Sequence, residues 1–191
     1  VTSHDRIEHT AFGLFAGQGF DDTTMDDIAD AVGVSRRTLF RYFESKNDIP
    51  WGRFDESLTS LADVLRSLPE SLSVADAVHR AVVVFNDFPA AALPQHRQRM
   101  SLILNTPALQ AHSTIKYRAW RQVIADYVAA RHGVSPDDLG PRTIGHVSLA
   151  LSLSAYEQWL EQPGTELSSL LDTALHSLRV HVGGLDTGDL A

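Results

Sequence analysis

The sequence predicts an all-α protein, with a small N-terminal helix-turn-helix domain followed by a larger helical domain. Apolar residues recur every three or four positions along almost the whole chain, which is the spacing of one face of a helix. The every-second-residue alternation of a strand is nearly absent, and proline or glycine follows most of the apolar segments, as expected where helices end. This pattern predicts about nine helices.

Three short helices are expected at the N-terminus. The first covers residues 3–17 and has one apolar face. The second begins after Thr24, an N-cap residue followed by acids, and ends at Gly33, while the third begins after Ser35. Glycine tolerates the positive φ of a tight turn, so the last two helices have helix-turn-helix spacing. An ordinary helical hairpin would have the same spacing and stays open as an alternative.

The rest of the chain continues as helices. Ser45 and Asp48 have the spacing of a capping box, which predicts a long fourth helix that runs to Pro69. Five more apolar-periodic segments follow. The expected domains are a helix-turn-helix domain over 1–47, an effector-binding and dimerisation domain over 48–184, and a flexible tail over 185–191.

Composition excludes several classes of protein. There is no cysteine, which removes disulfide frameworks and thiol nucleophiles, and no two of the nine histidines are three or four residues apart. We therefore expect no metal and no other cofactor. The sequence contains no G-x-S-x-G, Walker A or H-E-x-x-H motif, so no enzyme and no catalytic residue is expected. Without a long apolar run or a secretory pattern, the chain is expected to be soluble and cytoplasmic, with no membrane partner.

Charge is distributed unevenly. The formal net charge of −8 argues against a protein that coats nucleic acid by bulk electrostatics. Residues 33–47, however, contain four basic side chains and only Glu44 as an acid. A small basic segment in an acidic protein suggests a localised binding surface for an anion.

The third helix has the chemistry of DNA recognition. Ser35 as N-cap places Arg36 and Arg37 in the first turn, where cations oppose the helix dipole unless an external anion binds. Arginine is also suited to bidentate contact with guanine O6 and N7, so these two residues are expected to read bases. Leu39 and Phe43, four residues apart, should pack inward. The expected DNA-binding residues are Thr24, Ser35, Arg36, Arg37, Thr38, Arg41, Tyr42 and Lys46.

Some of these residues have a second interpretation. Taken alone, Arg36 or Arg41 could be a solvated surface cation, and Tyr42 could be a core aromatic with an exposed hydroxyl. A helical small-molecule-binding protein or enzyme, in which the helix-turn-helix is only structural, is the alternative function.

Residues 23–46 resemble the DNA-binding segment of the tetracycline-repressor (TetR) family. The match includes the preceding Phe12-x-x-Phe15-x-x-x-Gly19-Phe20 pattern. The resemblance implies a three-helix DNA-binding domain, a helical ligand-binding domain and a homodimer formed by the last two helices. It also implies a repressor that a small apolar effector releases from a palindromic, double-stranded DNA operator. An activator and a ligand-blind regulator remain alternatives.

The last apolar segments contain more apolar surface than one buried stripe needs, which suggests burial against both the chain's own core and a partner. A central core helix is the alternative, and the family resemblance favours the dimer interface. The expected interface residues are Leu160, Leu167, Leu171, Ala174 and Leu178. A pocket is expected between the fourth and eighth helices, although each of its residues could also be plain core. The expected lining is Phe54, Leu58, Leu61, Phe85, Phe88, Met100, Ile103, Leu104, Trp120, Ile124, Tyr127 and Tyr156.

Residues 46–55 and 99–109 also resemble segments of regulators from mycofactocin gene clusters. That resemblance implies a long-chain acyl-coenzyme A as effector. Four basic residues would then either face its phosphates or form a solvated face, namely Arg97, Arg99, Arg118 and Arg121.

Overall fold

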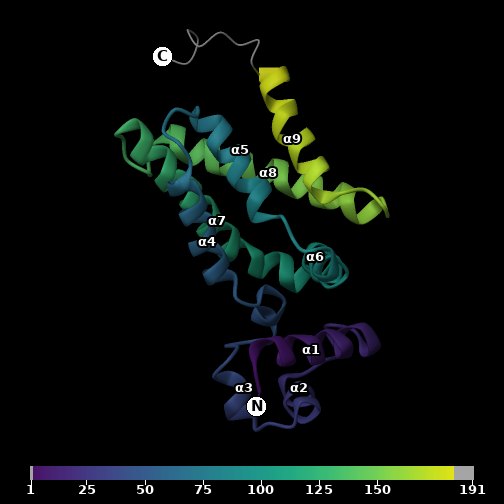
Figure 1. Cartoon of the computed structure of the whole chain (residues 1–191). Helices are drawn as coiled ribbons and strands as arrows, with labels where there is room; N and C mark the ends of the chain where they lie inside the picture. The colour runs from purple at the N-terminus through teal and green to yellow at the C-terminus, as the bar shows by residue number, and fades with distance from the viewer. Residues whose placement is uncertain (1, 183–191) are drawn as a thin grey trace. The chain divides into compact units, whose positions relative to one another are not determined.

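The computed structural model describes the backbone of residues 2–182 and the side chains of residues 2–177. Within this range it contains nine α-helices, two 3-10 helices and no strand (Figure 1). The prediction of an all-α protein is confirmed. The expected tail at 185–191 lies outside the described residues.

The chain forms two compact units. The first, here called the head, comprises the described residues up to Asp55 together with Ser101–Thr114. The second, here called the body, comprises Glu56–Met100 and the described residues from Ile115 onward. The head therefore extends beyond the expected boundary at residue 47, because Ile49 and Leu109 are both fully buried in its core.

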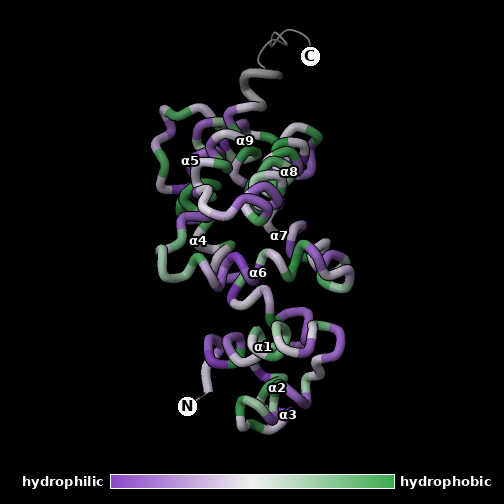
Figure 2. Tube along the Cα trace, turned by 90° about the vertical axis from the view of Figure 1, so that its right-hand side faces the viewer, coloured by the Kyte–Doolittle hydropathy of each residue, from purple (hydrophilic) through white to green (hydrophobic). Residues whose placement is uncertain are grey.

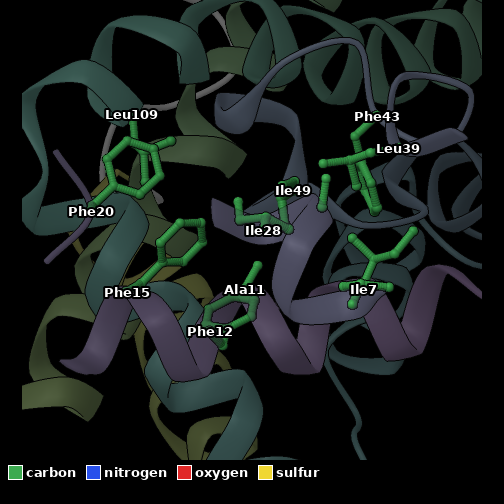
Figure 3. Packing of buried hydrophobic residues seen from close by; sticks show 12 residues of the cluster. Ile7, Ala11, Phe12, Phe15, Phe20, Ile28, Leu39, Phe43, Ile49 and Leu109 are labelled. Carbon is green, nitrogen blue, oxygen red and sulfur yellow. The ribbon is translucent and has the colours of Figure 1, made fainter. Parts of the chain in front are cut away.

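The head contains four helical elements of its own. These are α1 (His4–Gln18), α2 (Met25–Val32), α3 (Arg36–Phe40) and the 3-10 helix η1 (Lys46–Trp51). Figure 3 shows side chains from all of them meeting in one apolar core, with Leu109 added from α7 (Pro107–His132). Burying a large apolar side chain contributes about 1.5–3 kcal/mol, so this core is the main source of stability in the head.

Short-range capping sets the helix-turn-helix geometry. The Thr24 hydroxyl accepts a hydrogen bond from the Asp27 backbone N–H at 3.1 Å, and the Asp27 carboxylate accepts one from the Thr24 N–H at 2.8 Å. Gly33 ends α2 in the left-handed conformation, with φ 77°. Ser35 then caps α3 by accepting from the Thr38 N–H at 3.1 Å. These caps confirm the predicted starts of α2 and α3 and the predicted end of α2, whereas α3 is shorter than predicted and ends at Phe40.

The long fourth helix predicted from Ser45 is wrong at its start. Ser45 makes no side-chain capping bond to the backbone, and residues 46–51 form η1 instead. Gly52, with φ 53°, then breaks the chain direction before α4 (Phe54–Ser67). Pro50 lies inside η1, and its missing N–H suits a short 3-10 turn better than the interior of a long helix.

The body contains α4, α5 (Val74–Phe85), the 3-10 helix η2 (Ala90–Ala92), α8 (Leu139–Glu161) and α9 (Leu167–Val182). The first part of α6 (Leu93–Asn105) and most of α7 also belong to it. Hydrophobic and hydrophilic residues are interspersed along these helices (Figure 2). The apolar faces of α5, α8 and α9 pack against one another.

One close approach within the body depends on glycine. A Cβ at Gly145 in α8 would lie 2.8 Å from the backbone oxygen of Arg121 in α7. Since backbone atoms cannot move aside as a flexible side chain can, the two helices reach this separation only without a side chain at position 145.

Candidate nucleic-acid interface and effector region

The two faces of α3 differ sharply. Leu39 and Phe43 point into the head core and are almost fully buried, as predicted. Arg36, Arg37 and Arg41 are exposed. The short helix is therefore fixed to the head through its apolar side and presents three guanidinium groups to solvent.

The Arg36 side chain bridges α3 and α2. Its Nη1 atom lies 3.2 Å from Asp26 Oδ2, and both side chains are 62% exposed. Its Cζ atom lies 5.4 Å from the centroid of the Phe40 ring. Asp26 was not among the expected site residues, because the sequence gives no measure of how α2 and α3 cross.

Arg37 and Arg41 behave differently from Arg36. Among the described side chains, neither residue makes a side-chain hydrogen bond or an ion pair. Both guanidinium groups are therefore available to an external partner.

Thr24, Ser35 and Thr38 are all used in helix capping. The Thr24 hydroxyl and N–H both donate to the Asp27 carboxylate, and these hydrogen bonds hold the pKa of Asp27 below its usual range. The Ser35 and Thr38 hydroxyls lie 2.9 Å apart at the start of α3. All three side chains are near the exposed arginines in sequence, and their first role is to fix the backbone of the helix-turn-helix.

Tyr42 and Lys46, both expected to contact DNA, make contacts inside the head. The Tyr42 hydroxyl donates to the Thr2 carbonyl at 2.9 Å, and its ring meets His4 edge to face. Lys46 Nζ donates to the Phe20 carbonyl at 2.6 Å and lies 4.4 Å from the centroid of the Phe20 ring. These two side chains hold distant segments of the head together, which spacing along the chain could not reveal.

The body contains two hollows that bear on the expected pocket. One, of about 260 Å³, is lined by residues of α4 and α5 that include Leu61, Val64 and Phe85, together with Phe88 just after α5. The other, of about 700 Å³, lies among the end of α5, the start of α6 and the turn from α8 to α9. Both are open to solvent, and Phe88 lines both.

Only three of the twelve expected pocket residues line these hollows, namely Leu61, Phe85 and Phe88. Buried core positions are occupied instead by Leu58, Met100, Ile103, Trp120, Ile124 and Tyr156. Phe54 packs edge to face on Trp51, and Leu104 and Tyr127 are half-buried. Residues that look alike in the sequence because they are all apolar therefore have different environments in the structure.

A buried chain of hydrogen bonds crosses the body next to the larger hollow. The Tyr156 hydroxyl donates to Asn86 Oδ1 at 2.6 Å and lies 2.7 Å from His96 Nε2. Burial, together with the positive charge of Arg99, lowers the pKa of His96 to about 4, so the ring is neutral at pH 7. Burial also raises the pKa of Tyr156 above its usual range. A neutral His96 donates from Nε2 to the Tyr156 oxygen, so the hydrogen bonds run from His96 through Tyr156 to Asn86.

Asn86 and His96 were not expected at this site. Asn86 follows an apolar segment, which is a weak signal, whereas His96 lies among polar residues and gives none. Their contacts with Tyr156 span 70 and 60 residues. The His96 ring also stacks on Phe88, with ring centroids 3.9 Å apart.

Arg97 is committed to the end of α8. Its Nη1 donates to the carbonyls of Trp159 and Leu160 at 2.5 and 3.4 Å, and its Cζ lies 4.1 Å from the centroid of the Trp159 ring. A cation at the last carbonyls of a helix complements the helix dipole. Of the other expected basic residues, Arg118 is exposed, and Arg99 and Arg121 are half-buried.

Comparison with known proteins decides the family. Residues 7–49 match the family described as bacterial regulatory proteins of the tetR family, and residues 72–183 match the MftR C-terminal domain. The second match alone covers more than half of the chain. This chain belongs to the TetR family of transcriptional regulators. It is therefore a DNA-binding regulator and not an enzyme.

Individual relatives agree with this assignment. The regulator is 43% identical over 173 residues to the protein named as a mycofactocin biosynthesis transcriptional regulator, MftR, of Mycobacterium tuberculosis, covering 91% of this chain and 87% of that protein. It is 31% identical over 187 residues to the HTH-type transcriptional regulator TcmR of Streptomyces glaucescens, covering 93% and 83%. In fold it resembles Thermus thermophilus FadR, solved with lauroyl-CoA, with TM-score 0.59, 23% identity and coverage of 92% and 93%.

The last helix of the regulator places its apolar residues differently from the expected dimer interface. Leu167 and Leu171, expected at a partner, are buried in the body of the same chain, and Leu175 continues their stripe. Leu160, Leu170 and Ala174 are half-buried and remain open to a partner. The side chain of Leu178 lies outside the described residues.

Two further observations concern other kinds of partner. No helix within residues 2–182 combines the length and the apolar character that crossing a membrane would need. Across the same range, histidine and carboxylate side chains form no group of three close enough to hold a metal ion.

Proposed function

We propose that this regulator is a repressor that binds a palindromic DNA operator as a homodimer and that a small apolar effector releases it. The observation that carries this proposal is the outer face of α3. Arg37 and Arg41 are exposed there without a side-chain partner among the described residues, while the opposite face is buried. A helix fixed in this way can enter a major groove with its arginines directed at the base edges.

The arginines of α3 divide between two roles in this proposal. Arg36 and Arg37 read bases, since bidentate arginine contact to guanine is the commonest specific contact in the major groove. Arg41, Thr24, Ser35 and Thr38 contact phosphates and set the register. Phosphate oxygens accept hydrogen bonds, and only one of the Ser35 and Thr38 hydroxyls donates to the other, which leaves one O–H donor for a phosphate. A phosphate contact by Thr24 requires its hydroxyl to turn away from Asp27.

A homodimer is supported by the half-buried apolar residues of the last two helices. Leu160 in α8 and Leu170 and Ala174 in α9 are only partly covered by the described residues of their own chain. A two-fold dimer places two copies of α3 on successive major grooves, about 34–36 Å apart, which calls for a palindromic operator.

The proposed effector is a long-chain acyl-coenzyme A. The hollow of about 700 Å³ has a mixed lining. Its apolar part includes Phe88, Leu93 and Trp159 and suits an acyl chain, and its charged part consists of Asp87, Arg97 and Glu166. The Thermus thermophilus relative was solved with lauroyl-CoA, and the likeness to it supports the same class of ligand here. Coupling between two such sites is typically about 1–3 kcal/mol, so effector would weaken DNA binding by about 5- to 150-fold.

DNA reading is tested by titration with fluorescence anisotropy at one fixed salt concentration. The full-length protein first selects a duplex from a random pool, and a scrambled duplex serves as the non-specific probe. Arg37→Ala is expected to weaken binding to the selected duplex by about 1–3 kcal/mol and to affect the scrambled duplex less. Arg142→Ala, an exposed arginine of α8, is the matched control and should change neither titration. Equal losses on the two duplexes with Arg37→Ala would refute base reading.

The effector is tested separately on the wild-type complex with the selected duplex. Lauroyl-CoA is expected to dissociate this complex, and coenzyme A without the acyl chain is the control. If lauroyl-CoA leaves the DNA titration unchanged, the acyl-coenzyme A proposal is wrong, whereas the DNA-reading proposal stands on the previous experiment.

A further inference from the structure

The pair between Asp26 and Arg36 distinguishes one arginine of α3 from the other two. Asp26 Oδ2 accepts a hydrogen bond from Arg36 Nη1 at 3.2 Å, and the Arg36 guanidinium also lies against the Phe40 ring. Only Nη1 of Arg36 faces the carboxylate, so its other N–H groups stay available. Asp26 and the Phe40 ring therefore both contact the Arg36 guanidinium, which keeps N–H donors for a bidentate contact with a base.

The pair has little to do with the stability of the fold. Both side chains are 62% exposed, and exposed ion pairs contribute very little to the free energy of unfolding. The effect of the pair is therefore expected on the contact of Arg36 with DNA. An arginine that is already ordered loses less rotamer freedom when it binds a base.

The carboxylate of Asp26 has an electrostatic effect as well. It lies in the first turn of α2, beside Asp27 and 3.2 Å from the Arg36 guanidinium. A negative charge there weakens every contact with phosphate, whatever the DNA sequence. Asp27, its neighbour, is accounted for by the capping box with Thr24, whereas the one contact of the Asp26 carboxylate in the described residues is with Arg36.

We propose that Asp26 is a positioning residue for DNA specificity, which orients Arg36 toward guanine, while its charge weakens phosphate contacts with any duplex. This inference rests on the proposed base-reading role of Arg36. Removing the carboxylate should therefore raise affinity for any DNA and lower the discrimination between the selected and the scrambled duplex.

The test compares two variants of the same helix. Asp26→Asn removes the carboxylate that contacts Arg36, and Asp30→Asn removes an exposed carboxylate of α2 that makes no side-chain contact in the described residues. Both full-length variants lose one negative charge. Titrations on the selected and scrambled duplexes at fixed salt give a discrimination ratio for each. Asp26→Asn is expected to lower this ratio by about three- to tenfold, and Asp30→Asn to leave it unchanged.

A second background separates positioning from a general charge effect. In the Arg36→Ala protein, Asp26→Asn should no longer change the discrimination ratio, because the residue that it positions is gone. If Asp26→Asn matches Asp30→Asn in the wild-type background, or lowers the ratio equally in both backgrounds, the inference is overturned.

The same data distinguish a failure of the positioning role of Asp26 from a failure of the proposed base reading by Arg36. If Arg36→Ala leaves the discrimination ratio intact, the base-reading role of Arg36 fails and the positioning role fails with it. If Arg36→Ala lowers the ratio but Asp26→Asn behaves like Asp30→Asn, base reading by Arg36 stands and only the positioning role of Asp26 is wrong.

Discussion

The head and the body of this regulator differ in the sequence range of the polar contacts that define them. In the head, the helix-turn-helix is set by caps between residues three apart, from Thr24 to Asp27 and from Ser35 to Thr38. In the body, the buried hydrogen bonds of Tyr156 reach residues 60 and 70 positions away. The helix-turn-helix caps are therefore readable in one short segment, although Tyr42 and Lys46 also make long-range contacts in the head. The buried network of the body depends on residues that only the fold brings together.

The largest expected effect comes from the head core. Leu39 is completely buried, so Leu39→Ala should destabilise the head by about 2–5 kcal/mol and abolish DNA binding. Hydrogen exchange with mass spectrometry can follow head and body peptides in the same sample. Phe40→Ala, at a side chain that is 40% exposed, is the control and should cost much less. Undiminished protection of head peptides in Leu39→Ala would contradict this description of the core.

The body has its own expected signature, which is a dependence of stability on pH. The pKa of His96 is about 4 in the folded body, against 6.5 as its ordinary value. The unfolded chain therefore binds the proton more readily, and folding stability falls as pH drops from 6.5 toward 4. The loss should reach about 3 kcal/mol across this window.

Urea unfolding at a series of pH values measures this contribution. His96→Gln should flatten the difference between pH 7 and pH 4, while His146→Gln, at an exposed position of α8, should retain the full difference. Identical pH profiles for the wild type and His96→Gln would show that His96 is not the group responsible.

A smaller effect is expected where α7 and α8 approach each other in the body. A Cβ at Gly145 would lie 2.8 Å from the Arg121 carbonyl oxygen, so Gly145→Ala should cost about 1–3 kcal/mol through forced separation of the helices. Gly140→Ala, also in α8, has no atom within 4 Å of the new Cβ and should be neutral or slightly stabilising. The midpoints of thermal unfolding of the two variants measure the difference. Equal midpoints would contradict the close approach of α7 and α8 at Gly145.

The smallest expected effect is local to the head. Ser35→Ala removes the hydroxyl that accepts from the Thr38 N–H, which should cost about 0.5–2 kcal/mol. Ser154→Ala, within α8, removes a hydroxyl that bonds only to a carbonyl four residues earlier and should cost less. Chemical denaturation measures both, and a Ser35→Ala loss no larger than that of Ser154→Ala would argue against the cap.

The parts that the sequence could predict are those set by near neighbours. Leu39 and Phe43 are both buried as predicted, although α3 ends at Phe40 and Phe43 reaches the core from the turn that follows, and Gly33 adopts positive φ because a tight turn requires it. Lys46 and Tyr42 could not be placed in the same way. Their partners are the carbonyls of Phe20 and Thr2, 26 and 40 residues earlier, and a backbone carbonyl leaves no signal in the sequence.

Periodicity was also insufficient at the end of the body. It predicted more apolar surface on α9 than one buried stripe needs, but it could not say which residues meet the chain's own core. Leu167 and Leu171 face that core, and Leu170 and Ala174 are left half-buried. Periodicity shows which residues share a face of a helix. It does not show which face the neighbouring helices contact, and that information comes from the fold.

The most direct test of the DNA-binding account is methylation protection of guanine N7, which lies in the major groove. The account predicts two symmetric groups of protected guanines on the selected duplex, with centres about 10–10.5 base pairs apart or a multiple of that spacing, and loss of one guanine from each group with Arg37→Ala. A single asymmetric group, or protection confined to adenine N3 in the minor groove, would contradict it.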